Sequence, residues 1–234
     1  MSLISPTLSA QDNNKSSVTN QIWLDFNPKY KFTERWALGG TVGAKTIFPH
    51  SWTKVYISPQ MEYNMPKFML KKLMYKETLY LGIDLYSIFY TSADNLIEVS
   101  PFQGYGLTWP NRKRLDIKHM LKLKERFQWD THDWDYSFGL QLSYEASITF
   151  KFHGDVWKYG NGFYLTASIK FFWNLVDAAL FNDVARITPG IGYQINPKWK
   201  TAFLLGYNYT RDGDGESFHT NNIIYRFRIY YTIN

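Results

Sequence analysis

The chain of 234 residues contains no cysteine, which argues against a disulfide-stapled domain and against a zinc site built on thiolates. It has no run of 18 apolar residues, so the sequence predicts no transmembrane helix. The net charge of +6 is modest, and no basic cluster accompanies a recognisable nucleic-acid-binding module. We therefore expect no nucleic acid among the partners.

Aromatic residues are abundant. They make up 19% of the chain, with 18 Tyr, 17 Phe and 9 Trp. This share is high for an ordinary globular domain. A transmembrane β-barrel uses such residues in girdles at the two headgroup layers of the bilayer, so the composition favours that class.

The clearest pattern lies at residues 133–150, which read DWDYSFGLQLSYEASITF. Large apolar or aromatic residues occupy nearly all even positions, and small or polar residues occupy the odd ones. Such alternation predicts one extended strand, because a helix would scatter these residues around its circumference. At ~3.3 Å per residue the strand would be about 60 Å long, well beyond the usual globular strand. Its apolar face carries aromatics at both ends and Leu140, Leu142 and Ala146 between them, as a hydrocarbon band between two headgroup layers requires.

The same alternation marks out eleven segments. They cover residues 20–32, 35–48, 52–64, 75–90, 96–109, 115–129, 133–150, 163–173, 184–195, 199–210 and 222–233. Single-chain bacterial outer-membrane barrels have an even number of strands. We therefore predict an all-β fold, an antiparallel transmembrane β-barrel of about 12 strands, with 10 as the alternative. The barrel would occupy residues 20–234, and residues 1–19 would be a flexible N-terminus or the remnant of a leader peptide.

A soluble barrel or sandwich would show the same alternation with its apolar face inside. The segments are long, however, and burying eleven aromatic-rich faces would overfill such a core. We therefore predict that the apolar faces meet lipid and the polar faces line a lumen. The predicted lipid-facing residues are Phe138, Leu140, Leu142, Leu81, Ile83, Phe227 and Ile229. The predicted lumen-lining residues are Lys118, Lys122, Lys124, Arg126, Glu145, Lys170, Arg186, Arg226, Arg228, Asp84 and Glu62.

The charged lumen has two interpretations. Basic side chains along a pore lower the barrier for acidic solutes, which indicates a channel biased towards anions. Alternatively, the charges form an internal salt-bridge network that fills a narrow barrel, where unpaired charges would be expensive. Both interpretations stay open at this point.

Several residues break the pattern. Glu125 falls on the lipid face, so we expect either a bulge that rotates it inward beside Arg126, which we prefer, or a position at the rim. Three prolines inside segments, Pro59, Pro101 and Pro189, suggest bulges or strand ends, because proline removes a ladder hydrogen bond. Residues 66–74 read PKFMLKKLM and are compatible with a short amphipathic helix at a headgroup layer.

No residues form a recognisable catalytic or metal site. Asp212, Asp214 and Glu216 are candidate calcium ligands, but an acidic Gly-rich run is more often a plain turn. His132, Asp133 and Ser137 are the one local candidate for nucleophilic catalysis, and no G-x-S-x-G motif is present. We expect no metal, no cofactor and no enzymatic activity.

Four patches carry a family resemblance. They are WLDFNPKY at 23–30, EVSPFQGYGLTWP at 98–110, LKLKERF at 121–127 and NDVARITPGIGYQIN at 182–196. Together they resemble a family of Gram-negative outer-membrane β-barrels known only as a domain of unknown function, number twenty-four-ninety. The resemblance spans about residues 21–234, and implies a fold and a membrane but no activity. The final Asn234 departs from the terminal aromatic common in such barrels, although Tyr231 and Ile233 keep the alternation.

From these observations we expect an integral barrel of the bacterial outer membrane, in contact with lipid and lipopolysaccharide. Its expected function is that of a narrow passive channel for small solutes, with anions favoured. The alternative is a closed barrel that serves as a structural or accessory subunit of an envelope secretion or assembly complex, with a protein partner. A lipid-modifying outer-membrane enzyme is a distant third.

Overall fold

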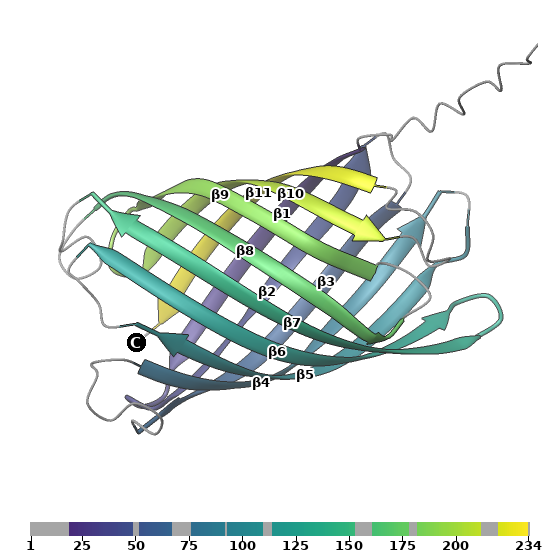
Figure 1. Ribbon diagram of the computed structural model, residues 1–234, viewed down its shortest axis with the longest axis horizontal. Helices are drawn as coiled ribbons and strands as arrows, with labels where there is room; N and C mark the ends of the chain where they lie inside the picture. Colours follow the sequence, from purple (N-terminus) through teal and green to yellow (C-terminus); the bar gives the residue numbers. More distant parts are fainter. Residues whose placement is uncertain are drawn as a thin grey trace, which may run out of the picture.

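The computed structural model describes residues 19–48, 52–66, 76–91, 93–109, 114–152, 161–177, 182–211 and 220–233. These residues form eleven long, tilted β-strands (Figure 1). The strands are β1 (Thr19–Lys31), β2 (Trp36–Phe48), β3 (Trp52–Met65), β4 (Lys76–Tyr90), β5 (Leu96–Thr108), β6 (Leu115–Asp130), β7 (Tyr136–Lys151), β8 (Gly162–Val176), β9 (Asn182–Gln194), β10 (Trp199–Arg211) and β11 (Thr220–Ile233). The described part of the chain contains no helix long and apolar enough to cross a membrane.

The strands close into a barrel in sequence order, and β1 meets β11 at the seam. The all-β barrel is thus confirmed, and each of the eleven predicted segments corresponds to one strand. The described strands number eleven rather than twelve or ten. With an odd number of strands, the first and last run in the same direction. The seam is accordingly a parallel ladder, with register from Thr19↔Asn222 to Tyr30↔Ile233, while all the other neighbours in the described barrel are antiparallel.

The distribution of side chains is inverted relative to a soluble protein. The outer face exposes large apolar residues, such as Leu81 at 66% and Leu24 at 55% of their maximal accessible surface. The interior buries charged and amide side chains, such as Glu98 and Gln128 at 1% each. Soluble proteins usually expose large apolar residues singly, whereas here such residues recur along nearly every strand.

The residues predicted to face lipid lie on this outer face. Leu81 and Phe227 are exposed. The others are half-buried among their neighbours and alternate with inward side chains: Phe138, Leu140, Leu142, Ile83 and Ile229.

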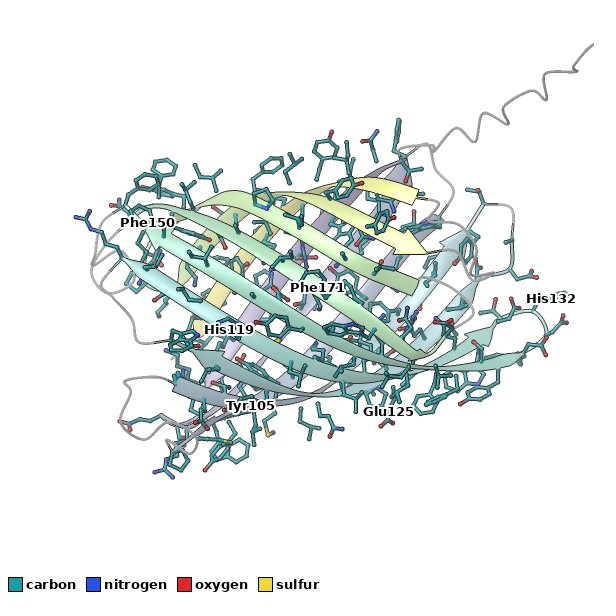
Figure 2. The ribbon with its side chains drawn as sticks, viewed as in Figure 1. Tyr105, His119, Glu125, His132, Phe150 and Phe171 are labelled. Atoms are coloured by element: carbon teal, nitrogen blue, oxygen red, sulfur yellow. The ribbon has the colours of Figure 1, made fainter. Side chains whose placement is uncertain are left out.

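Aromatic side chains cluster on the outside at both ends of the barrel. Figure 2 shows the two ends, with Phe150 at one and His132 beyond the other. At the end with the β1–β2 turn, ring pairs lie 4.3–4.9 Å apart: Trp199–Tyr231, Trp36–Tyr63, Phe163–Tyr193 and Tyr30–Phe32. At the opposite end, near the β6–β7 turn, the pairs are Phe127–Phe138 at 5.3 Å and Trp129–Tyr136 at 5.7 Å.

The three internal prolines do not cause the bulges that the sequence suggested. Pro59, Pro101 and Pro189 each keep their register with one neighbouring strand. In the ladder with the other neighbouring strand, two residues around each proline are unpaired, and the register is the same before and after them. In an antiparallel ladder the N–H and C=O of one residue point to the same neighbour, so a missing N–H weakens one side only. The register shifts in the described ladders lie elsewhere, at Leu140/Gln141 and Tyr209/Thr210.

The expected bulge at Glu125 is also absent. The β6–β7 ladder runs without a shift through the pair Glu125↔Leu140. The neighbouring Arg126 is buried inside, so alternation directs Glu125 outward, where it is exposed on the apolar face (Figure 2).

The segment predicted at 133–150 is shorter than expected at its start. β7 begins at Tyr136, because the residues before it form the turn that follows Asp130. Within that turn Trp134 has a positive φ of 59°, which a strand does not accommodate. Residues 67–74 of the predicted helix at 66–74 and the N-terminal residues 1–18 lie outside the described residues.

Candidate functional site

The barrel encloses a cavity of about 470 Å³, lined by side chains from every strand. Nine of the eleven residues predicted to line the lumen border it: Asp84, Lys122, Lys124, Arg126, Glu145, Lys170, Arg186, Arg226 and Arg228. The other two lie apart from the cavity. Glu62 is buried in an ion pair with Lys29, and the Lys118 Nζ lies 4.8 Å from the centre of the Tyr80 ring.

Asp25 organises the wall at the seam. It lies on β1 opposite Arg228 of β11, and the fully buried carboxylate binds Arg226 and Arg228 together. The Arg228 Nε donates to the Asp25 Oδ2 at 2.9 Å, and the Tyr56 hydroxyl donates to the Oδ1. One carboxylate therefore compensates two guanidinium groups, which leaves an excess of positive charge here.

In the described part of the chain, Glu98 and Arg126 form the most deeply buried ion pair, with side chains 2% and 6% exposed. The Arg126 Nη2 and Nε donate to the two carboxylate oxygens at 3.0 and 3.3 Å. Gln128 and Ser100 donate further hydrogen bonds at 2.8 and 2.6 Å. A carboxylate held by this many donors satisfies its acceptors within the wall, so the pair has a structural role.

Asp84 and Lys124 form a second ion pair, across two strands. Ser58 donates to one Asp84 oxygen, and the Tyr86 hydroxyl donates to the other at 3.0 Å. Lys124 also contacts the Tyr86 hydroxyl at 3.2 Å. This cluster, too, is satisfied within the wall.

Asp183 and Arg186 pair on β9 at 2.9 Å, and Asn208 bridges them with two further bonds of 2.9 Å. The two residues are three apart in sequence, so strict alternation would place them on opposite faces. The register shift beside Tyr209/Thr210 skips one residue of β9 and returns Asp183 to the inner face. This acidic residue was missed from the sequence because a bulge cannot be read from alternation.

Over the residues that the structure describes, the ion pairs between strands join strands that are at most two positions apart in the barrel, and the Lys170–Glu145 contact of 3.9 Å between β8 and β7 is one of them. They consequently lie along the wall and leave the cavity between them. Nine of the residues that border the cavity are basic and four are acidic, namely Asp84, Glu98, Glu145 and Asp183. Asp25, which pairs with Arg226 and Arg228 but does not border the cavity, adds a fifth carboxylate.

Two of the basic residues form no ion pair with any residue that the structure describes. The Lys45 Nζ lies 3.8 Å from the Trp23 ring centre and 4.8 Å from that of Tyr56. The Lys122 Nζ lies 3.5 Å from the Phe102 ring centre. Cation–π contacts stabilise such amines only modestly and do not replace an ion pair. Lys45 was not among the predicted lumen residues, although its place in the alternation of 35–48 was a sufficient signal.

The catalytic candidates do not assemble. His132 lies 3.7 Å from Asp133 in the exposed β6–β7 turn. Ser137 donates its hydroxyl to Gln128, at 3.3 Å, inside the barrel. Among the described residues, no group of three or more His, Cys, Asp or Glu residues is arranged to hold a metal ion. The calcium candidates Asp212, Asp214 and Glu216 lie outside the described part of the chain.

These features define a closed β-barrel with an ionised interior and an apolar exterior. The chain belongs to the family described as Protein of unknown function (DUF2490), whose sequence model matches residues 20–232. The family to which the sequence pointed is thereby confirmed, and its description assigns no activity. A search of curated proteins finds no significant match.

Proposed function

We propose that the protein is an integral barrel of a bacterial outer membrane and forms a narrow passive channel for small anions. One observation carries the proposal: nine basic and four acidic residues border a cavity inside a barrel whose outer face is apolar. Lipid and lipopolysaccharide would cover the outer face, and aromatic girdles would mark its two borders.

The charge excess supports anions over cations. A charge in a confined, poorly solvated space needs a counter-charge, and Lys45 and Lys122 form no ion pair with the described residues. An anion in the lumen supplies that counter-charge, whereas a cation adds to the repulsion.

The test is single-channel recording in planar bilayers across a potassium chloride gradient. The expected reversal potential has the sign of chloride permeation. Lys122→Glu is the informative variant, because Lys122 borders the cavity without an ion pair in the described structure and its replacement leaves the wall pairs intact. It should shift the reversal potential towards cation permeation. Glu125→Gln, on the outer face, is the matched control and should leave it unchanged.

Arg126 is a less suitable target for this test. Its pairing with the buried Glu98 means that an acidic replacement breaks the wall itself. Absence of any current from protein that has inserted and folded would contradict the channel.

The second candidate is a closed barrel that serves as an accessory subunit of an envelope complex. The exposed Glu125 on the apolar face favours it, because a carboxylate in contact with acyl chains is unfavourable and a protein partner relieves that cost. This function predicts no current and a partner that co-purifies with the wild-type protein but not with Glu125→Leu.

A further inference from the structure

We propose that the lumen contains a specific binding site for a multivalent oxyanion of the phosphate class, where Lys45, Arg186 and Arg226 converge on Trp23. This inference rests on the proposed function, because solutes reach the site only through the lumen. It adds the class of anion that the lumen binds.

The geometry is set by the Trp23 ring. The Lys45 Nζ lies 3.8 Å from the ring centre, and the guanidinium carbons of Arg186 and Arg226 each lie 4.8 Å from it. The three cations are therefore close together, because the separation of any two cannot exceed the sum of their distances to the ring centre. The cations come from β2, β9 and β11, so three separate parts of the wall meet here.

The ring itself is fixed. Trp23 is 4% exposed, and its Nε1 donates a hydrogen bond of 2.8 Å to the Gln21 Oε1. Trp23 and all three cations border the cavity, so a solute inside the lumen reaches them. The arrangement is a preorganised cationic surface within the wall.

The local carboxylates do not balance the cations. Asp25 binds both Arg226 and Arg228, and Asp183 binds Arg186. Lys45 forms no ion pair with any described residue. Four positive charges therefore face two negative ones, and the surplus of two positive charges is what a dianion would balance.

The donors select an oxyanion of that charge. Guanidinium groups and an ammonium bind phosphate-like oxygens through short, charge-assisted hydrogen bonds. A phosphate group carries about −1.5 to −2 charges at neutral pH and several acceptor oxygens, so it can contact three cations at once. Chloride compensates a single charge and bridges fewer donors. The cavity of about 470 Å³ has ample room for such a group.

The test is calorimetric titration of the detergent-purified full chain with inorganic phosphate. We expect saturable binding of one phosphate, displaced by sulfate but not by an equal concentration of chloride. Lys45→Met removes one of the two surplus charges and keeps the apolar stem over the ring, and should weaken binding at least tenfold. The matched control is Lys118→Met, a lysine over the Tyr80 ring outside this cavity, which should change the affinity less than twofold.

Non-saturable binding to the wild-type protein, or equal affinity in Lys45→Met, overturns the site. Folding of each variant is checked by its heat-dependent migration on gels. If Lys45→Met does not fold, the double variant Asp183→Asn with Arg186→Gln takes its place. It removes one of the three cations beside the Trp23 ring without changing the net charge, and it should also weaken phosphate binding at least tenfold. Unchanged affinity in that variant overturns the site as well.

The bilayer recordings separate this inference from the proposed function. Phosphate binding without current leaves the site standing and contradicts the channel. An anion-selective current without saturable phosphate binding leaves the channel standing and contradicts the site.

Discussion

Asp25 and Arg228 face each other across the parallel seam that closes the barrel, and the Arg228 Nε donates to the Asp25 Oδ2 at 2.9 Å. The same carboxylate binds Arg226, also from β11. An ion-paired cluster therefore joins the first strand to the last at the seam where the barrel closes. The contact links the closure of the fold to the charge of the lumen.

Replacement of Asp25 by Asn should destabilise the barrel strongly. Two buried arginines would lose their common counter-charge, and breaking a buried pair in this way costs roughly 3–5 kcal/mol. Urea unfolding in lipid vesicles, followed by tryptophan fluorescence, measures the change. Asp133→Asn is the control, because this residue is exposed in the β6–β7 turn, and it should stay within about 0.5 kcal/mol of the wild type. Equal stability of Asp25→Asn and Asp133→Asn would refute a structural role for the seam cluster.

Gly192 should tolerate no side chain. A Cβ there would lie 2.1 Å from the Tyr164 ring, which is held by a hydrogen bond of 3.0 Å to the Thr201 carbonyl. Gly192→Ala should therefore destabilise the barrel by about 1–3 kcal/mol through overpacking. At Gly39 the nearest atom would be 3.4 Å away, an ordinary contact, so Gly39→Ala is the matched control. Similar unfolding midpoints for the two variants would contradict the described packing of β8 against β9.

Leu81→Lys tests whether the outer face meets lipid. Leu81 is 66% exposed in the interior of β4, so in water a lysine there would be nearly neutral. In a bilayer the same change should cost about 2–4 kcal/mol near the midplane. The comparison is made by reversible unfolding in vesicles, with Leu81→Met as the apolar control. An unchanged unfolding free energy for the lysine variant would argue against a lipid environment.

Glu125→Leu should have the opposite effect. On a face that we propose to be covered by lipid, removal of a carboxylate should stabilise the barrel, and we expect a gain of about 1 kcal/mol in the free energy of unfolding in vesicles. A loss of a co-purifying protein, together with unchanged stability, would instead support the accessory-subunit function.

The sequence was sufficient to predict where the strands lie and which side chains point inward or outward. Period-2 alternation depends only on local backbone geometry, so it placed Lys122, Arg226 and Leu81 on the correct faces without knowledge of their neighbours. The number of strands was harder to predict from the sequence. The even-number rule assumes antiparallel closure, and a parallel seam between β1 and β11 is a global property of the chain.

The contacts of the site could not be predicted because they depend on register. Asp84 pairs with Lys124 two strands away, and Asp183 faces inward only through the irregularity in β9. Trp23 stood on the polar face of its segment, but its three cations come from strands far apart in sequence. Glu125 shows the converse: the preferred bulge was wrong, because the buried Arg126 fixes the alternation around it.

The central claim is that the exposed apolar face is covered by acyl chains while the polar face lines a lumen. The absence of native cysteine permits single nitroxide labels at Leu81→Cys, on the outer face, and at Ser168→Cys, on the cavity wall. Electron paramagnetic resonance in vesicles then compares the accessibility of each label to oxygen and to a water-soluble nickel chelate. We expect oxygen to relax the Leu81→Cys label more strongly than the nickel chelate does, and we expect no such difference in favour of oxygen at Ser168→Cys. A Leu81→Cys label that is freely accessible to the nickel chelate would contradict it.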